Sequence, residues 1–402
     1  MNKFSKWYIL AIMLFLCLVI MPVTFSKYST KIRTTITLNA RQPEYTIVFN
    51  SNEPVGSATG TMTNQLFIYG VAQDLNANNF SVNDYIFYEW NTQADGLGIA
   101  YSDKENILNL SSVDGDVIDL YAQWRDEIIT IEPPDGTTTG EYILNKVKTL
   151  ANNNTAISNP YTYVDTNITA FKRATKAQYN SVKSSLTTSN TISVSSSICE
   201  MYMWFDDTTG TIYYYTEADK VAISGNAQRM FARMYNLTDI SGLTYFDMSN
   251  TTDMNRMFQN CHSLDDLSPL ADWDVSNVTN MNYMFGSDYI DSSSPKSLFT
   301  DLTPLANWDV SNVTNMDQMF KMTSVNSVEP IKNWDVSKVT TFKQMFNRAN
   351  LTTATSLSIW NPASGTNFDM FFANMGMSTN NMPIFQTRPG TWDSSGKYFP
   401  TN

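Results

Sequence analysis

The sequence predicts an α+β protein of several parts: an N-terminal signal or membrane helix, a small β module and a C-terminal repeat solenoid. Three observations lead to this prediction. An uninterrupted apolar run extends from Trp7 to Met21, and apolar residues alternate with others from Tyr45 to Phe49. The phrase from Trp273 to Phe285 is repeated almost unchanged from Trp308 to Phe320.

Residues 1–28 are expected to form a signal peptide or an N-terminal membrane anchor. Lys3 and Lys6 precede the apolar run, and the first acidic residue of the chain is Glu44. This order is typical of an export signal, while the run is slightly shorter than the roughly 20 residues that span a bilayer. Cleavage and retention both stay open. The sequence therefore predicts an extracellular or cell-surface protein that contacts the membrane if this segment is uncleaved.

The composition agrees with export. The chain has 26 basic and 38 acidic residues, and five of the basic ones lie within the first 33 positions. The acidic remainder repels phosphate backbones, which argues against a nucleic-acid partner. Cys17, Cys199 and Cys261 are too few for a disulfide framework, so the last two are expected to be small buried residues. Few cysteines in an exported chain favour a Gram-positive bacterium.

Residues 43–125 are expected to form a separate β module. Its matching segments are Gln65-Leu66-Phe67, Trp90-Asn91-Thr92, Ala94-Asp95-Gly96 and Leu120-Tyr121-Ala122-Gln123-Trp124. This stretch resembles the Listeria–Bacteroides repeat, also called the internalin B-repeat. The resemblance implies a small β-grasp-like sheet of the kind used in bacterial surface proteins. Asp84 and Glu89 stand where that family usually has glycine, so the turns are expected to differ.

Residues 126–195 are expected to be a linker and a small adaptor region. Pro133-Pro134-Asp135-Gly136 and three threonines read as a linker. Segments 141–151 and 170–186 have helical spacing amid Asn, Ser and Thr. We expect this region to pack on the first coil of the repeats.

Residues 196–393 carry a Met-Phe pair, or a close variant, about once every 27 residues. The pairs begin at Met230, Met257, Met284, Met319, Met345 and Phe371, which gives steps of 27, 27, 35, 26 and 26. Such a period is typical of a leucine-rich solenoid of about six coils. Apolar residues recur every third position from Leu264 to Trp273, which predicts a short strand and a tight bend. Val278, Met281 and Phe285 lie at i, i+3 and i+7, which predicts a short helix after them. The Met-Phe pairs are expected to fill the core.

The repeated phrase, Trp-Asp-x-Ser-x-Val-Thr-x-Met-x-x-Met-Phe, resembles the BspA-like leucine-rich repeat of bacterial surface proteins, of the DUF285 type. The lead-in from Met203 to Tyr215 is similar to the segment that precedes such repeats. The resemblance implies a BspA-type solenoid over residues 196–393. An extra eight or nine residues near 286–296 depart from the pattern and are expected to form a surface loop.

The sequence gives little support to catalysis. The only histidine is His262, so no Ser-His or Cys-His pair and no zinc site of the usual kind is available. Paired acids such as Asp206-Asp207 and Asp265-Asp266 are expected to be solvated, and a carbohydrate-acting enzyme stays only a remote alternative. We therefore expect a protein that is not an enzyme and holds no cofactor, calcium aside.

Calcium is considered because an aspartate follows the Trp or Phe of four successive coils, whereas Asn361 stands at this place in the next coil. The four aspartates are Asp247, Asp274, Asp309 and Asp335. In one interpretation, each carboxylate accepts backbone N–H bonds at its own bend. In the other, stacked carboxylates bind Ca²⁺ between neighbouring coils, since oxygen ligands suit that ion.

The predicted function is adhesion. Resemblance to bacterial surface proteins implies a non-enzymatic binding protein that contacts protein or glycan ligands on a host matrix or on neighbouring cells. Specificity is assigned to side chains that differ between coils, with exposed aromatics and an acidic rim. The residues chosen are Tyr283, Tyr289, Gln318 and Gln344. The alternative is a structural spacer or envelope protein without a dedicated ligand.

Overall fold

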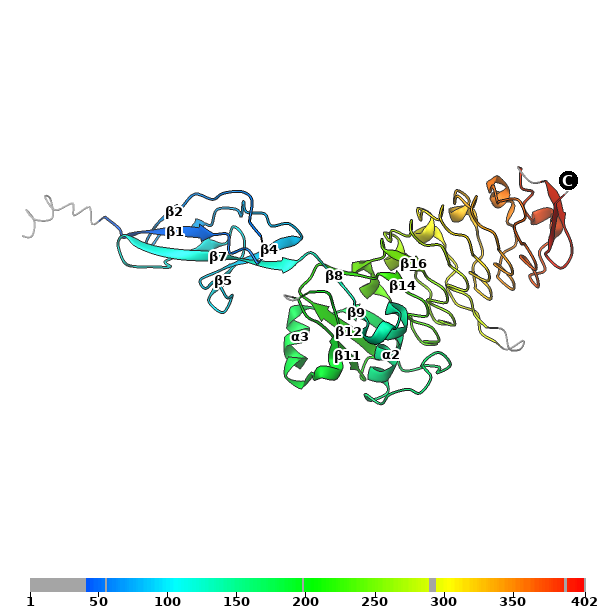
Figure 1. The fold of residues 1–402 in the computed structure, drawn as a ribbon, viewed down its shortest axis with the longest axis horizontal. Coiled ribbons are helices and arrows are strands. Elements are labelled where there is room, and N and C mark those ends of the chain that lie inside the picture. Colours follow the sequence, from blue (N-terminus) through cyan, green and yellow to red (C-terminus); the bar gives the residue numbers. More distant parts are fainter. Residues whose placement is uncertain (1–40, 55, 197–198, 289–293, 387–388, 401–402) are drawn as a thin grey trace, which may run out of the picture. The chain divides into compact units, whose positions relative to one another are not determined.

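The computed structural model describes residues 41–54, 56–196, 199–288, 294–386 and 389–400 (Figure 1). The signal or membrane helix expected in residues 1–28 lies outside the described residues. Among the residues described, no helix combines the length and the apolar character needed to cross a membrane. The chain divides into two compact units, Met1–Phe80 with Glu89–Gln123 and Ser81–Tyr88 with Trp124–Asn402.

The first unit is built on a five-stranded sheet with the order β2-β1-β7-β4-β5. β1 runs parallel to β7, whereas β1 with β2 and β4 with β5 are antiparallel pairs. The short strands β3 and β6 form a separate antiparallel pair. The strands span β1 Glu44–Asn50, β2 Gln65–Ile68, β3 Gln73–Asp74, β4 Tyr85–Asn91, β5 Ala100–Tyr101, β6 Asn106–Ile107 and β7 Asp116–Asp126.

The alternation from Tyr45 to Phe49 is confirmed as β1, whose odd-numbered residues are buried. Phe49 packs on Trp90 of β4, with ring centroids 4.8 Å apart. Asp95-Gly96 lies in a turn, and Gly96 has a φ of +74° that favours glycine. A β-grasp sheet packs on a helix, but the described residues between 41 and 123 contain strands and no helix. The β-grasp-like expectation is therefore wrong, and this unit is a mixed β-sheet.

The second unit begins with two sheets and the two α-helices found among the described residues. One sheet has the order β10-β11-β12-β9 and the other, fully parallel, has the order β15-β13-β8. Their elements are β8 Ile128–Thr130, α2 Thr139–Ala151, β9 Ala170–Arg173, α3 Lys176–Val182, β10 Thr191–Ile192, β11 Met201–Asp206, β12 Thr211–Thr216, β13 Lys220–Ala222 and β15 Phe246–Asp247. The helical spacing at 141–151 is confirmed by α2. Within 170–186, residues 170–173 form a strand instead, and the helical expectation is confirmed only for α3.

The adaptor region packs on the first repeat, as expected. The N–H of Asp165 donates to the carbonyl of Arg233 at 2.9 Å, and the N–H of Phe171 donates to that of Asp239 at 2.8 Å. Ile143, Leu144 and Val147 of α2 are fully buried in the hydrophobic core that continues through the repeats. Residues 126–195 and the repeats thus share one core.

The repeats do not have the expected coil of strand, bend and helix. Their described residues contain no α-helix from Gly225 onward, and the strands are only two or three residues long. These strands are β14 Gly225–Asn226, β16 Thr251–Asp253, β17 Gly390–Trp392 and β18 Tyr398–Pro400, in addition to β15. Single parallel bridges, such as Asn280 with Asn315, connect the later repeats. The predicted α+β leucine-rich-repeat solenoid is therefore wrong, and the protein is mostly sheet and loop.

The helix fails to form because the backbone bonds to the next repeat. The N–H groups of Met281, Tyr283 and Phe285 donate to the carbonyls of Asn315, Asp317 and Met319 at 2.8 to 3.1 Å. An α-helix would send these bonds to carbonyls four residues back. Tyr283 also has a φ of +60°, which an α-helix of L-residues excludes. The i, i+3, i+7 spacing in this segment therefore reflects tight turns.

The Met-Phe pairs fill the core, as predicted. Each pair is buried, and the second residues form a row of stacked rings from one repeat to the next. Neighbouring centroids lie 5.5 to 5.9 Å apart along Phe231, Phe258, Phe285, Phe320, Phe346 and Phe372. Trp273, Trp308, Trp334 and Trp360 each donate the indole N–H to a carbonyl in an earlier repeat, at 3.0 to 3.2 Å.

Candidate functional site

Two kinds of turn recur in the repeats. The Trp-Asp bend carries the four aspartates considered for calcium. We call the other the Met-Phe turn, and define it as the five residues from the one before each pair to the second after it. The six Met-Phe turns are residues 229–233, 256–260, 283–287, 318–322, 344–348 and 370–374. Three of the four residues predicted to bind a ligand, Tyr283, Gln318 and Gln344, are the first residues of such turns.

At the Trp-Asp bends, each carboxylate is held by its own chain. Oδ1 of Asp247, Asp274, Asp309 and Asp335 accepts the N–H two residues on, at 2.9 to 3.0 Å. Hydrogen bonding from Ser311 lowers the pKa of Asp309 below its ordinary value. This is the geometry of the first interpretation. Among the described residues, no group of three or more His, Cys, Asp or Glu is placed to hold a metal ion, and calcium stays a prediction to be tested.

Each Met-Phe turn begins with a left-handed residue. The φ angles are +59° at Arg229, +57° at Arg256, +60° at Tyr283, +58° at Gln318, +58° at Gln344 and +54° at Met370. The N–H groups of the first five donate to carbonyls of the following repeat. A left-handed conformation costs a residue with a Cβ about 1 kcal/mol or more. The turn is thus a fixed backbone platform on which the first side chain changes from repeat to repeat.

The predicted binding residues have different surroundings. Tyr283 is only 4% exposed, so the expectation of an exposed aromatic is wrong at this position. Gln318 and Gln344 are half-buried. Oε1 of Gln318 accepts a hydrogen bond from Nζ of Lys321 at 3.0 Å, and Nε2 of Gln344 lies 3.6 Å from Sδ of Met370. Tyr289 lies outside the described residues.

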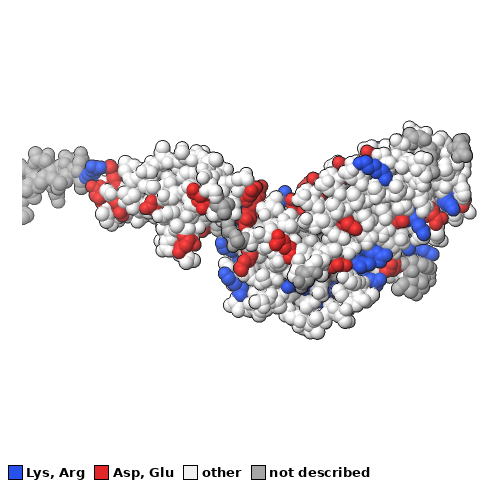
Figure 2. Space-filling view, in the orientation of Figure 1, with Lys and Arg blue, Asp and Glu red and all other residues white. Residues whose placement is uncertain are grey.

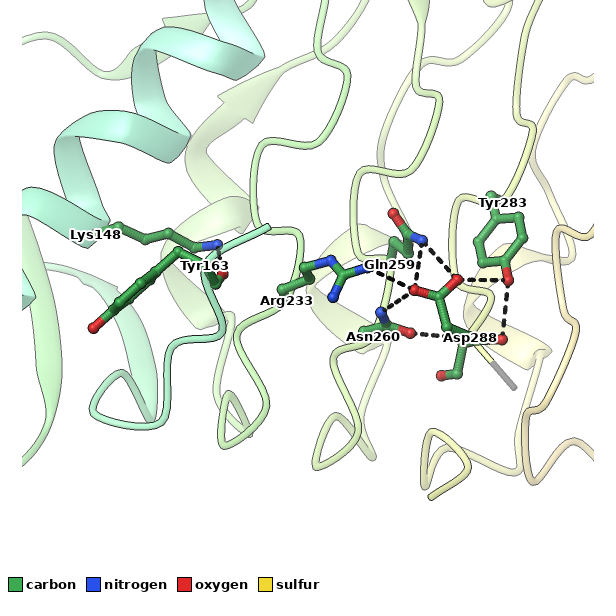
Figure 3. Close-up of polar contacts among 8 residues, drawn as sticks. Lys148, Tyr163, Arg233, Gln259, Asn260, Tyr283 and Asp288 are labelled. Atoms are coloured by element: carbon green, nitrogen blue, oxygen red, sulfur yellow. Dashed lines mark hydrogen bonds and ion pairs between the residues drawn. The ribbon is translucent and has the colours of Figure 1, made fainter. Parts of the chain in front are cut away.

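Tyr283 is buried because the base of the insertion covers it. Its hydroxyl donates to Oδ1 of Asp288 at 3.0 Å (Figure 3). Arg256 and Lys321 both lie over its ring, with the guanidinium carbon and the ammonium nitrogen 5.4 Å from the centroid. Burial, followed by the charge of Asp288, raises the pKa of this phenol. Tyr283 therefore acts as a platform for two cations.

Asp288 joins three repeats through its side chain. Its carboxylate accepts hydrogen bonds from Nη2 of Arg233 at 2.8 Å, Nε2 of Gln259 at 3.1 Å and Nδ2 of Asn260 at 2.8 Å (Figure 3). Its backbone N–H donates to Oδ1 of Asn260 at 2.6 Å. Burial alone would raise the pKa of Asp288, but hydrogen bonds from Asn260 and Tyr283 and the charge of Arg233 hold it below its ordinary value. The insertion is thus anchored by an ionised carboxylate.

A buried lysine lies on the adaptor side of this cluster. Lys148 of α2 is fully buried, and Nζ donates to the carbonyls of Pro160 and Tyr163 at 3.0 and 2.8 Å (Figure 3). Burial lowers the pKa of Lys148 to about 8. Both acceptors are neutral, so the lysine orders the 160–163 loop without a direct ion pair.

His262 has a structural environment. Its ring lies 4.3 Å from that of Tyr235, and Nε2 is buried without a hydrogen-bond partner. Burial lowers the pKa of His262 to about 4, so the imidazole is neutral at physiological pH. Cys199 and Cys261 are free and buried, as expected.

Residues 225–290 and 293–394 match one family model, described as a Mycoplasma protein of unknown function, DUF285. The repeat region is similar to DUF285. The expected DUF285 resemblance is thereby confirmed for this part of the chain, and the break between the two matched segments falls within the insertion. No curated protein and no solved structure matches the chain.

Two features of the repeats differ from the sequence-based expectations. The sequence predicts that Asp288 belongs to a surface loop, but its carboxylate binds residues 28 and 55 positions earlier in the chain. The basic residues of the Met-Phe turns were also overlooked, because the acidic composition of the whole chain hid them. Aligning the turns and adding up their charges would have revealed the second feature, whereas only the folded chain reveals the first.

Proposed function

We propose that this is a bacterial cell-surface or secreted binding protein without enzymatic activity, which uses the Met-Phe turns of its repeats to contact protein or glycan ligands on a host matrix or on other cells. The observation that carries the proposal is a constant backbone with changing side chains. Position one of the turn is occupied in succession by Arg, Arg, Tyr, Gln, Gln and Met, always with φ between +54° and +60°. A scaffold that serves stability alone would gain from glycine or asparagine there.

The resemblances support a surface location. The repeated phrase resembles BspA-like repeats, and residues 43–125 resemble the Listeria–Bacteroides repeat, two families found in bacterial surface proteins. Export through the segment of residues 1–28 agrees with both, as does a Gram-positive source. If that segment is uncleaved, it also makes the membrane a partner. We therefore place the repeats outside the cell.

The environment of His262 supports a non-enzymatic role. Its pKa of about 4 is too low for a base poised near neutral pH, and its only aromatic neighbour described here is Tyr235. The four bend aspartates are engaged with backbone N–H groups rather than paired with one another. Contact along the repeats, and no covalent step, is the proposed mechanism.

A direct test compares residues 41–402 with residues 41–125 for binding to immobilised fibronectin, other matrix proteins and a glycan panel. Saturable binding by the longer protein alone is expected. The variant Gln318→Ala/Gln344→Ala should then weaken binding, while Ser356→Ala, at a half-buried position outside these turns, should not. Absence of binding to every ligand would refute adhesion and favour a structural spacer.

A further inference from the structure

Charge is segregated within the repeats. The six Met-Phe turns contain Arg229, Arg233, Arg256, Lys321 and Arg348 and no Asp or Glu. The chain as a whole has 38 acidic and 26 basic residues, so an all-basic set of turns runs against its composition. The Trp-Asp bends carry the opposite sign, with an aspartate in each of four repeats. Figure 2 shows blue side chains along the lower part of the repeats, with red ones among them, and a separate blue group at the upper border.

Four of these five cations occupy strained backbone positions. Arg229, Arg233, Arg256 and Arg348 have φ angles of +57° to +62°. Asn260 and Asn374 occupy the equivalent last position of other turns at lower cost, because asparagine tolerates this conformation. Strain at non-glycine residues is commonly retained where function needs the side chain. The structure thus gives a reason to look for a role of the guanidinium groups.

The cations are close enough to influence one another. Burial and then Arg348 lower the pKa of Lys296, which lies beside the turns at the end of the insertion. Burial also lowers the pKa of Lys321, with Asp288 opposing and Arg348 adding to the effect. Arg256 and Lys321 share the ring of Tyr283. Mutual repulsion of this kind is relieved when an anion binds.

Asp288 offsets only part of this charge. It forms an ion pair with Arg233 at 2.8 Å and hydrogen bonds with Tyr283. Arg256 and Lys321 instead lie over the ring of Tyr283, each 5.4 Å from its centroid. Four of the six turns carry a cation, and neighbouring turns stack at the 5.5 to 5.8 Å interval of the phenylalanine row, so the cations are distributed along the length of the repeats.

We propose that the Met-Phe turns bind a linear polysaccharide that carries sulfate or carboxylate groups, with Arg256 and Lys321 as central contacts. This inference rests on the proposed function, since it names the ligand class of the same surface. Cations distributed over several stacked turns fit an extended chain that carries anionic groups along its length. Nucleic acid fits less well because the acidic remainder of the protein repels it and because Tyr283, at 4% exposure, offers no face for base stacking.

The test measures binding of the full-length protein to immobilised heparin, hyaluronate, neutral dextran and duplex DNA. Heparin carries sulfate and hyaluronate only carboxylate, so the two distinguish the anionic group. We expect binding to at least one of them and none to dextran. Raising NaCl from about 50 to about 200 mM should weaken it about tenfold, as expected for roughly two released counterions.

The variant Arg256→Asn/Lys321→Gln removes two charges while asparagine keeps the left-handed turn. It should weaken polysaccharide binding about tenfold, with little change in the midpoint of thermal unfolding. The matched control Lys332→Gln/Lys338→Gln removes two charges beside the Trp-Asp bends and should bind as the wild type does.

Equal loss in both variants would overturn the proposal, because net charge alone would then explain binding. It would also be overturned by DNA binding as tight as that of heparin, or by absence of binding to both anionic polysaccharides. If binding to a matrix protein persists in that last case, the proposed function survives and only the ligand class is wrong.

Discussion

Asp288→Asn is the substitution that tests the cluster at the base of the insertion most directly. The carboxylate accepts hydrogen bonds from Arg233, Gln259, Asn260 and Tyr283 at 2.8 to 3.1 Å. An amide offers one acceptor oxygen and adds two N–H donors that meet other donors. Hydrogen bonds to charged groups contribute about 1.5–3 kcal/mol each, but the side chain is 34% exposed and water replaces part of the loss. We expect a loss of about 2 kcal/mol in the free energy of unfolding.

The effect should depend on pH in a defined direction. The pKa of Asp288 is lowered from 3.8 in the folded protein. Its ionised form therefore contributes stability that is fully present above the pKa of Asp288 in the unfolded chain. This stability is lost as the pH falls through the pKa of Asp288 in the folded protein. The difference between wild type and Asp288→Asn should be complete at pH 7 and should shrink below about pH 4.

Urea unfolding followed by tryptophan fluorescence, at neutral pH and near pH 3, measures both quantities. The matched control is Asp309→Asn, since asparagine can still accept the N–H of Ser311 through its own Oδ1. The control should change stability by less than about 0.5 kcal/mol. A loss below that size for Asp288→Asn at pH 7, or a loss of the same size at both pH values, would refute the assigned role of the carboxylate.

Three further predictions concern the core, the buried lysine and calcium. Phe285→Ala removes a ring stacked on both Phe258 and Phe320 and should cost about 3–5 kcal/mol in urea unfolding, more than removal of the end ring Phe372. Equal costs would contradict a continuous stack. Lys148 has a pKa of about 8 in the folded protein. Relative to Lys148→Met, the free energy of unfolding of the wild type should rise by up to about 3 kcal/mol between pH 8 and 10, because the unfolded chain binds the extra proton there. A parallel pH profile of the two proteins would show that burial does not perturb this lysine. EDTA should leave the melting temperature unchanged, because the bend aspartates already accept backbone N–H bonds, and a drop of several degrees would establish the calcium interpretation instead.

Local patterns in the sequence were enough to locate several elements. The alternation at Tyr45–Phe49 gave a strand, Asp95-Gly96 gave a turn and the segment 141–151 gave a helix. The Met-Phe pairs identified the core of the repeats, because a residue type that recurs at one position of every repeat has to meet its own copies. Each of these inferences depends on contacts that are close in sequence or repeated with one period.

The conformation of the repeats was decided by contacts between them. The spacing of Val278, Met281 and Phe285 suits a helix as well as a series of tight turns. In the structure, the backbone N–H groups of Met281 and Phe285 donate to carbonyls of the following repeat, and Tyr283 adopts a left-handed φ that forms the turn. The helical spacing within one repeat does not show whether its N–H groups will bond to carbonyls four residues back or to carbonyls of the adjacent repeat.

The sequence by itself determined the repeat period, the residues that fill the core and the opposite charges of the Trp-Asp bends and the Met-Phe turns. Each of these follows from the order of residues within a repeat. Only the tertiary structure decided that Tyr283 is buried, that Asp288 holds Arg233 from 55 positions away and that Arg256 and Lys321 share one ring. The physical reason is that burial and hydrogen-bond partners depend on which distant segments are brought together, and the insertion that brings Asp288 there occurs only once in the chain.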